Sequence, residues 1–406
     1  MKSWLSVAAI VVLCLALVVG VACGGGGGEE EEGVTEIELG HAAPLSGIMG
    51  AIAGMPAGMA IDLLVEQIGV FEVGGKQYRW KIIHEDNEGA SAGGGVATTT
   101  KFIYTDRVDF VLQCGAAALT GQGLCEESGV IIDMGSTQFE GFGPDHPYSI
   151  QSGPSIITHV AAFYDWLAEE HPEVKRIVVV ASDDPLTIAF AEVFESNIHE
   201  YFGFELDIIR TPLGADAYPV ATNVMMLDPD LVIASVSYLD VVWDMGYEGL
   251  SAVNNGVMTE SYLEQAGWDD CKGLLLFFPE CFGAEEVWPE AVAFAREFED
   301  RYDVEMQTVA FWGVVVQEAM TAALQQAGTV DDTAKIMETV HSRTILDSMV
   351  GPVYYGGEAF VGVNCLLMWP TGIWEIVGER EYELLDYYTP EEAEAIAAEA
   401  WTATMP

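Results

Sequence analysis

Small and hydroxyl-bearing residues follow three segments that the sequence predicts as strands, in the loops 44–50, 115–123 and 135–138. Small side chains allow backbone N–H groups to approach a ligand, and the N-terminus of a helix favours a negative charge. The loops "GAAALTGQG" and "GSTQ" therefore predict a cradle for an anion such as a carboxylate. Each loop taken alone fits an ordinary helix cap or turn better, so the hypothesis depends on all three recurring at equivalent strand ends.

The sequence has no signature of a common enzyme, nucleotide site or metal site. It contains no GxxxxGK[ST] and no GxGxxG after a predicted strand. Pro44 stands where GxSxG would need its first glycine, and His84 begins no HExxH. The seven histidines show no metal-ligand spacing. We therefore expect no catalytic residue, no cofactor and no metal, with an enzyme of unrecognised type as the alternative.

The charge balance excludes one class of partner. The chain carries 64 acidic and 15 basic residues, for a formal net charge of −49, and it has no basic cluster. Nucleic acids are bound by clustered lysine and arginine side chains that neutralise phosphates, so we expect no nucleic-acid partner. The charge also opposes long-range attraction of anionic ligands.

Apolar segments of strand length alternate with segments of helical periodicity, which favours parallel sheets covered by helices on both faces. The predicted strands are 37–43, 109–113, 130–133, "KRIVVVAS", "FELDIIRT", "DLVIASV", "NNGVMT" and "GLLLFF", with a hairpin turning at Gly74-Gly75. The predicted helices are 54–68, 92–104, 119–127, 155–169, 186–199, 289–302 and 308–326. A chain of 406 residues exceeds one typical core, so we expect two α/β domains, each a doubly wound parallel sheet, with a barrel as the alternative.

The N-terminus is typical of an exported protein. Lys2 precedes an apolar run over 7–19, and small residues follow up to Cys23. This order predicts a signal peptide over 1–22. The end of the segment resembles a bacterial lipoprotein signal, in which the cysteine is lipidated and becomes the first residue. An uncleaved anchor helix is the alternative, and either places the rest of the chain outside the cytoplasm.

Residues 23–35 include the low-complexity run "GGGGGEEEEG", which cannot bury apolar area. Glycine and like charges are typical of a flexible, extended chain. We interpret this run as a tether that holds a folded body away from a membrane.

Five cysteines follow the tether, namely Cys114, Cys125, Cys271, Cys281 and Cys365. An exported protein permits disulfides. Cys114 and Cys125 are close in sequence, as are Cys271 and Cys281, but spacing alone leaves the pairing open.

Several segments resemble one known family in their order along the chain. They are "PLSG", "AIDLLVEQIG", "YRWKIIHEDNEGA", "DFVLQCGAAALTGQGLCEESGVIIDMGST", "RIVVVASDDPLTIAFAEVF", "FWGVVVQEAMTAALQQAG" and "VGPVYYGG". They are similar to segments of extracytoplasmic solute-binding proteins of the branched-chain amino-acid type, which have the type I periplasmic binding fold. The resemblance covers about residues 37–376, and the order and spacing of the segments carry it.

The resemblance implies two lobes that close on a ligand by bending at three crossovers. We expect the crossovers near 151–154, 276–280 and 349–353. Lobe 1 would then comprise 36–151 and 279–350. Lobe 2 would comprise 152–278 and 351–406.

The resemblance also implies which residues contact the ligand. In the family, backbone amides and hydroxyls of the first lobe hold a ligand carboxylate, and an acid of the second lobe takes an ammonium. The corresponding first-lobe positions are Ala117, Ala118, Thr120, Ser136 and Thr137. The second-lobe positions are Leu186, Tyr238 and the acid Glu260. Tyr238 also fits simple packing, and Glu260 also fits a solvated loop residue.

Other positions near the expected cleft depart from the family pattern. In the "PLSG" loop we expect Leu45, Ser46 and Met49 to form a wall where the family often has an aromatic residue. Leu186 likewise replaces an aromatic residue, and Asp184 fits either a helix cap or a contact to a cationic group. The expected pocket is thus more apolar than usual, which leaves the ligand class open.

The resemblance implies a monomeric, lipid-anchored substrate-binding protein that delivers a small solute to an ABC-type permease, without catalysis. We expect a branched-chain or other apolar amino acid as the ligand. The alternatives are a small aromatic or aliphatic carboxylate, or a ligand sensor that works with a separate signalling partner. In each case the protein would lie outside the cytoplasm, at the cell surface or in the periplasm.

Overall fold

The computed structural model describes residues 33–114, 117–135, 139–182, 191–212, 214–253, 260–277, 285, 287–306 and 308–404. Residues Thr35–Pro406 form one compact unit. The expected signal peptide, the lipidation candidate Cys23 and most of the expected tether lie outside the described residues. Within the described part, no helix is long and apolar enough to cross a membrane.

The first sheet has a parallel centre and an antiparallel edge. Its order is β2-β3-β1-β4-β5-β6, and β1, β4, β5 and β6 run parallel. These strands are β1 (Val34–Ala43), β2 (Phe71–Val73), β3 (Lys76–Asp86), β4 (Phe110–Cys114), β5 (Ile131–Gly135) and β6 (Ser149–Ile150). The predicted hairpin at Gly74-Gly75 is confirmed, because β2 and β3 pair in antiparallel register and both glycines have positive φ.

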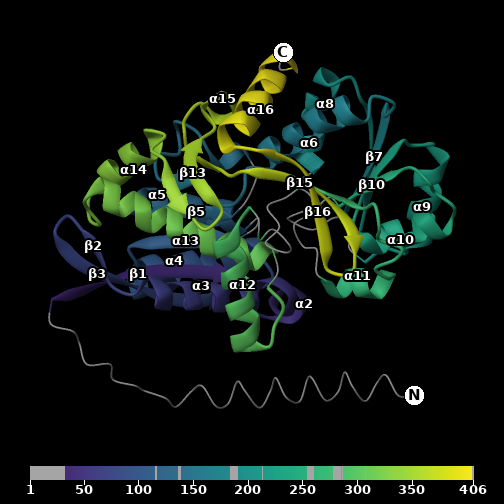
Figure 1. Cartoon of the computed structure of the whole chain (residues 1–406). Coiled ribbons are helices and arrows are strands. Elements are labelled where there is room, and N and C mark those ends of the chain that lie inside the picture. Colours follow the sequence, from purple (N-terminus) through teal and green to yellow (C-terminus); the bar gives the residue numbers. More distant parts are fainter. Residues whose placement is uncertain are drawn as a thin grey trace, which may run out of the picture. The chain divides into compact units, whose positions relative to one another are not determined.

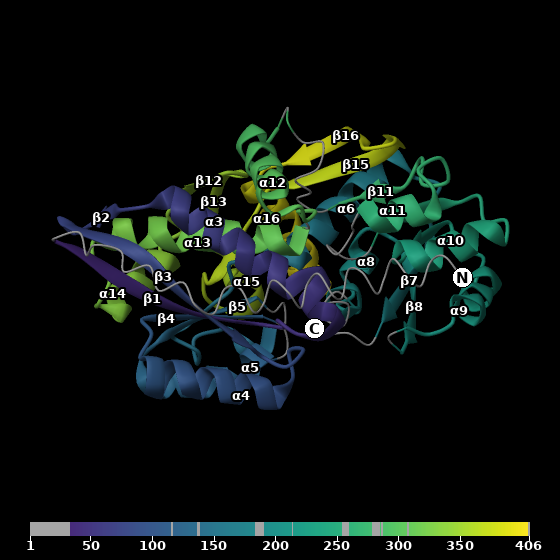
Figure 2. The same cartoon turned by 90° about the horizontal axis from the view of Figure 1, so that it is seen from below.

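Helices cover both faces of the first sheet. In Figure 2, α3 (Met55–Ile68) and α13 (Thr308–Ala327) lie on one face, and α4 (Ala92–Lys101) and α5 (Ala117–Ser128) on the other. The "SAGGGVATT" run opens α4, with the Ser91 side chain accepting from Gly94 N at 3.0 Å.

The second sheet has the order β16-β15-β11-β10-β9-β7-β8. Its strands are β7 (Arg176–Ser182), β8 (Glu205–Thr211), β9 (Leu231–Ile233), β10 (Leu250–Ala252), β11 (Leu275–Leu276), β15 (Thr371–Gly378) and β16 (Glu381–Tyr388). Strands β7 to β11 run parallel, and the yellow hairpin β15–β16 adds to them in antiparallel fashion (Figure 1). In β7, Ile177 and Val179 join one apolar core while Val178 and Val180 join another, so this sheet also buries both faces.

The helices around the second sheet form two packed groups. Helices α6 (Ile156–Glu170), α8 (Ile198–Tyr201) and α16 (Pro390–Thr404) pack together. Helices α9 (Ala217–Met226), α10 (Val236–Asp244) and α11 (Glu260–Ala266) form the other group.

A small antiparallel sheet joins β12 (Leu346–Ser348), β13 (Gly351–Gly356) and β14 (Leu366–Met368). The remaining helical elements are α2 (Gly47–Met49), η1 (Gly50–Gly54), η2 (Phe102–Asp106), η3 (Phe139–Gly141), α12 (Pro289–Tyr302), α14 (Thr333–His341) and α15 (Glu358–Val361). The α/β prediction with parallel sheets is confirmed, and the barrel alternative is excluded because both large sheets are open.

Some predicted elements differ from the structure. The predicted strand "NNGVMT" lies outside the described residues, while the observed strand β10 immediately precedes it. The predicted helix 186–199 falls partly outside them, and its described part is interrupted by a turn before α8 begins at Ile198.

The chain crosses between the two large sheets after β6, after β11 and after β14. The third crossing therefore lies at 369–370, later than the expected 349–353. The reason is that β13 and β14 stay with β12, and Leu366 bridges to Gln151 beside the first sheet. The two-lobe division stays a prediction, with 351–368 nearer to the first sheet than expected.

The C-terminal helix α16 is anchored by a largely buried carboxylate. Both oxygens of Glu394 accept from the Arg343 guanidinium, at 3.1 and 2.6 Å. The same carboxylate accepts from the Tyr354 hydroxyl and from Gly357 N, each at 2.8 Å. The Arg343 guanidinium also lies 4.6 Å from the Tyr354 ring centre. These bonds hold α16, which packs on α6, against the small sheet.

Replacing Glu394 should therefore destabilise the fold. We expect Glu394→Gln to lower the free energy of unfolding by about 2 kcal/mol, because charge-assisted hydrogen bonds to a buried group are lost. Urea denaturation measures the change. The matched control is Glu285→Gln, which removes an exposed ion pair with Arg296 and should leave the urea midpoint unchanged. Equal midpoints for the two variants would contradict the anchoring role.

Candidate functional site

Both large sheets contain the strand order at which open α/β proteins bind ligands. Strands β3-β1-β4-β5-β6 and β8-β7-β9-β10-β11 share one pattern, in which the first strand in sequence lies between the second and the third. At this switch point, successive helices turn to opposite faces of the sheet and leave a crevice outside the carboxyl ends of the strands. The candidate site thus comprises the loops that follow β1, β4 and β9, while the loop that follows β7 lies outside the described residues.

Glycines fix the position of the loop after β1. A methyl group at Gly54 would overlap the carbonyl oxygen of Pro44, and one at Gly50 would lie 2.6 Å from the carbonyl carbon of Leu45. The loop is therefore seated directly on the backbone of η1. A π-helical turn of this kind is often found at functional sites.

A carboxylate holds the same loop from the other side. Asp86, the last residue of β3, accepts from Leu45 N at 3.1 Å. Hydrogen bonds from the Ser46 hydroxyl and from backbone N–H groups lower the pKa of Asp86. The Ser46 hydroxyl is thus directed to Asp86, whereas Leu45 and Met49 keep part of their apolar surface exposed.

The first turn of α5 is packed more tightly than expected. Ala117 and Ala118 have no exposed surface, and Ala118 belongs to the apolar core between α5 and the sheet. The Thr120 hydroxyl faces the carbonyl oxygens of Ala117 at 2.7 Å and Ala92 at 3.1 Å. These side chains join α5 to α4, so any contact of this turn with a ligand would use the backbone.

At the second switch point, α10 begins directly after β9. Its N-cap residue Ser235 makes no side-chain cap, and Tyr238 is only 5% exposed and packs in the apolar core. Glu260 is the first residue of α11. Its side chain and the predicted contacts Ser136, Thr137, Asp184 and Leu186 lie outside the described residues.

Side chains cap some helix starts of the described chain and leave others uncapped. The helices α4, α9 and α14 are capped by the side chains of Ser91, Asp216 and Asp332. The helices α2 and α10, which begin at the switch points after Ser46 and Ser235, have no side-chain cap. Other helices, among them α3, α6 and α12, also lack a side-chain cap, so capping alone does not distinguish the switch points.

The sequence reasoning missed a buried acid behind this edge. Asp133 on β5 is 2% exposed, and its Oδ1 accepts from Ser152 N at 3.0 Å. Burial raises the pKa of Asp133 to about 7. The signal in the sequence was an aspartate inside the apolar strand "IIDMG".

A second missed group is a histidine pair, in which His41 is buried and His84 is partly exposed. The Nδ1 atoms of His41 and His84 lie 2.8 Å apart, and His84 Nε2 lies 3.0 Å from Asp62. Burial, and then the neighbouring His84, lower the pKa of His41 to about 3, so this ring is neutral. Among the described residues no group of three or more potential ligands could hold a metal ion.

Three cysteines in the described part of the chain are free thiols. Cys125, Cys271 and Cys365 are buried and free, so neither sequence-adjacent pair forms a disulfide. Burial raises the pKa of Cys125 and Cys365 to about 12, which makes both unreactive.

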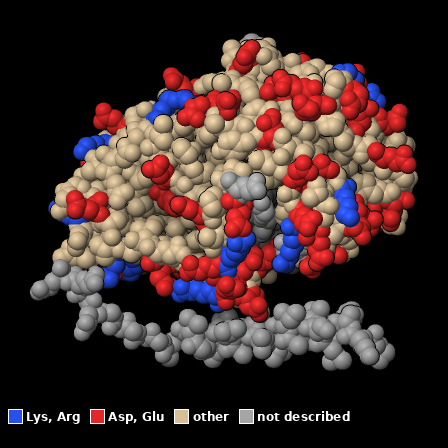
Figure 3. Space-filling view, in the orientation of Figure 1, with Lys and Arg blue, Asp and Glu red and all other residues tan. Residues whose placement is uncertain are grey.

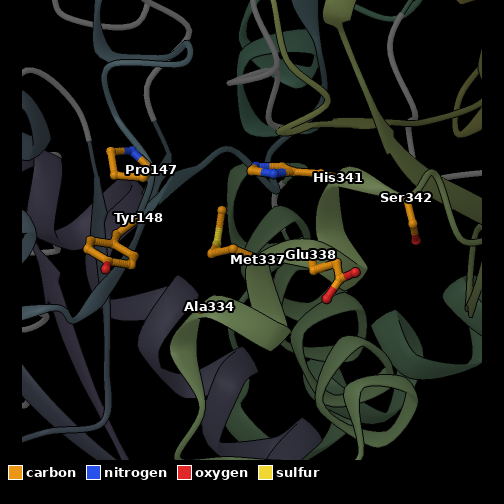
Figure 4. Close-up of a pocket in the computed structure, with 7 residues that line it drawn as sticks. All are labelled: Pro147, Tyr148, Ala334, Met337, Glu338, His341 and Ser342. Atoms are coloured by element: carbon orange, nitrogen blue, oxygen red, sulfur yellow. The ribbon is translucent and has the colours of Figure 1, made fainter.

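Surface features do not point to a different site. Acidic side chains are spread over the face seen in Figure 3, with few basic ones among them. A surface hollow lies between α14 and the segment before β6 (Figure 4), away from the switch points. Its lining residues are Pro147, Tyr148, Ala334, Met337, Glu338, His341 and Ser342.

No family model matches the sequence. Solved structures, however, share the fold. A leucine-binding protein from Thermotoga maritima is 16% identical, with a TM-score of 0.70 over 87% of this chain and 99% of that one. A Rhodopseudomonas palustris ABC-transporter solute-binding protein in complex with benzoate is 15% identical, with a TM-score of 0.70 over 87% and 97%. A periplasmic binding protein from Burkholderia mallei is 14% identical, with a TM-score of 0.72 over 88% and 96%.

The chain has the type I periplasmic binding fold. The fold expected from the segment order is therefore confirmed, although sequence identity is low. At such identity the likeness establishes the architecture and leaves the ligand to be argued from this chain.

The close approach of Gly54 to the loop gives a direct test. We expect Gly54→Ala to lower the free energy of unfolding by about 1–3 kcal/mol, because the added methyl group forces the Pro44 backbone away. Gly123→Ala is the matched control, since a methyl group there meets no atom within 4 Å in the middle of α5. That control should be neutral or stabilising by up to about 1 kcal/mol. Thermal unfolding of the two variants compares them, and a neutral Gly54→Ala would contradict the seating of the loop.

Proposed function

We propose that this protein is an extracytoplasmic substrate-binding protein that delivers a small solute to an ABC-type permease. The observation that carries the proposal is the pair of open, doubly wound sheets, each with a switch point at the carboxyl ends of its parallel strands. Helix N-termini at such a switch point offer backbone N–H groups to a carboxylate without a basic side chain. The proposal involves no catalytic step and no cofactor.

The N-terminal sequence supports an anchored form of the same protein. We propose that the signal peptide over 1–22 is removed and that Cys23 carries a lipid. The glycine- and glutamate-rich run would then place the folded unit above the membrane. Mass spectrometry of the mature protein from membranes tests this, because a lipidated N-terminal cysteine has a defined mass.

The ligand we favour is a branched-chain or other apolar amino acid. Its carboxylate would meet the helix starts of the first sheet, together with Ser136 and Thr137. Its ammonium would meet Glu260, and its side chain would meet the apolar surface of Leu45 and Met49. A buried, unpaired Glu260 would repel a simple anion, so a zwitterion fits better than a carboxylate alone.

Small aromatic carboxylates are the second candidate. Solute-binding proteins of this fold have been solved with benzoate, with 4-hydroxybenzoate and with 3,4-dihydroxybenzoic acid. The apolar residues expected in the pocket, Leu45, Met49 and Leu186, would also suit a ring.

Thermal-shift screening separates these two ligand classes. Leucine, isoleucine and valine should each raise the melting temperature, because a ligand at 100 times its Kd stabilises the folded state by about 2.7 kcal/mol. Benzoate and 4-hydroxybenzoate form the comparison arm. A response to the aromatic acids alone would reject the amino-acid assignment, and no response to either class would count against the proposed site.

The role of Glu260 has its own test. We expect Glu260→Gln to weaken leucine binding by at least tenfold in isothermal titration, because the ligand ammonium loses its counter-charge. Glu264→Gln, four residues further along α11 at an exposed position, is the control and should bind as the wild type does. Unchanged affinity in Glu260→Gln would remove this residue from the site.

A further inference from the structure

One residue of the first crossing segment, Ser152, forms hydrogen bonds with three parts of the fold. Ser152 N donates to Asp133 Oδ1 on β5 at 3.0 Å. The Ser152 Oγ lies 2.7 Å from the Tyr355 hydroxyl on β13. Its carbonyl oxygen accepts from the Trp369 indole at 3.2 Å, in the third crossing segment. Ser152, Asp133, Tyr355 and Trp369 are all buried, so any bending at these crossings must change this cluster.

Backbone pairing holds the neighbouring residue in the same way. Gln151 N donates to Cys365 O at 2.9 Å, and Leu367 N donates to Gln151 O at 2.7 Å. The chain before the third crossing therefore runs beside the first crossing. At these two crossings, a rotation between the sheets is then confined to the few residues that follow Gln151 and Met368.

The charge state of Asp133 is open to change in this setting. Its Oδ2 accepts no hydrogen bond from the described residues. Burial raises the pKa of Asp133 to about 7, although hydrogen bonds from the Ser152 hydroxyl and N–H lower it. No lysine, arginine or histidine is among the groups that shift it.

The titratable groups around the cluster are neutral near pH 7. Burial raises the pKa of Tyr355, which faces Asp133 from β13, and that of Cys365 behind it. His159 on α6, bonded to Thr371 after the third crossing at 2.6 Å, has its pKa lowered to about 3 by burial. Asp133 is thus the one group of this set that changes charge near neutrality.

We propose that Asp133 is a proton-controlled positioning residue of the hinge, in which the buried, neutral carboxyl group favours the packed cluster seen here and the carboxylate favours a bent state that admits water. This inference rests on the proposed function, because it assumes a binding protein that opens and closes. The bonds from Ser152 favour the carboxylate, so burial is the effect that disfavours the charge in this structure. The second oxygen of the carboxylate has no partner among the described residues until water reaches it.

The sign of the pH effect follows from the raised pKa. The structure seen here binds the proton of Asp133 more tightly than a state with a hydrated carboxylate does. Rising pH therefore shifts the equilibrium away from this structure, with a midpoint near pH 7. The shift ends once the carboxylate is fully charged.

Single-molecule FRET on the full chain tests the proposal without any ligand. Tyr104→Cys and Met226→Cys place the two dyes at exposed positions beside the first and second sheets. We expect the transfer efficiency to change between about pH 6 and pH 8, with a midpoint near pH 7. The parent protein, which lacks these two cysteines, is treated with the same dyes and shows whether the native thiols react with them.

Three further variants make the test specific. Asp133→Asn keeps an oxygen for Ser152 N and should abolish the pH dependence. Ser152→Ala removes the hydroxyl that lowers the pKa of Asp133, so its midpoint should move to higher pH. Glu318→Gln is the matched control, because Glu318 is half-buried, also accepts one backbone N–H, from Met349 at 3.0 Å, and also has a pKa raised to about 7. It should retain the wild-type profile.

A flat profile in the wild type would overturn the proposal. So would a pH response that persists in Asp133→Asn, or one that Glu318→Gln abolishes equally. If Asp133→Asn fails to fold, the direction of the midpoint shift in Ser152→Ala decides. A clear hinge response combined with no solute binding would reject the proposed function alone, whereas solute binding without a hinge response would reject this inference alone.

Discussion

The short parallel pairing of Gln151 with the chain around Leu366 is the constraint on which much of the structure depends. It places the start of the first crossing next to the end of β14, so that both lead into the second sheet from one place. The two open sheets can then each direct the carboxyl ends of their parallel strands to loops that no other strand covers. A site at the switch points follows from this arrangement rather than from any one motif.

The parallel centres of the sheets were predictable because local pattern and burial agree. The run "RIVVV" in β7 is apolar throughout, and the structure buries it on both faces. The antiparallel part after residue 349 was not predicted. Strand β16 reads "EYELLDYY", with exposed acids among its apolar residues, and α16 begins with three acids in its first four positions after the proline. Such segments are fixed by partners far away in sequence, including Arg343 for Glu394.

The location of the candidate site was predictable from the sequence, but the contacts that its residues make were not. The "PLSG" loop does follow a strand at a switch point, as its small residues indicated. Asp86, which orders that loop, is 41 residues away from Leu45, and no local sequence pattern indicates the hydrogen bond between them. The tight packing of Ala117 and Thr120 likewise depends on α4, which approaches through Gly95. Sequence position identifies a strand end, whereas the direction of each side chain there is decided by these long-range contacts.

The apolar core between α6 and α16 affects the order in which the chain folds. Ala393, Ala397 and Ala400 complete an apolar cluster with residues of α6, and the nearby pair Asp165 and Tyr388 is separated by 223 residues. Closing so long a loop must precede the burial that stabilises it, which makes this a slow step. Until α16 has been synthesised and packs on α6, one face of the second sheet lacks this helix. A chain built in this way stays incompletely folded during synthesis until its last residues are available.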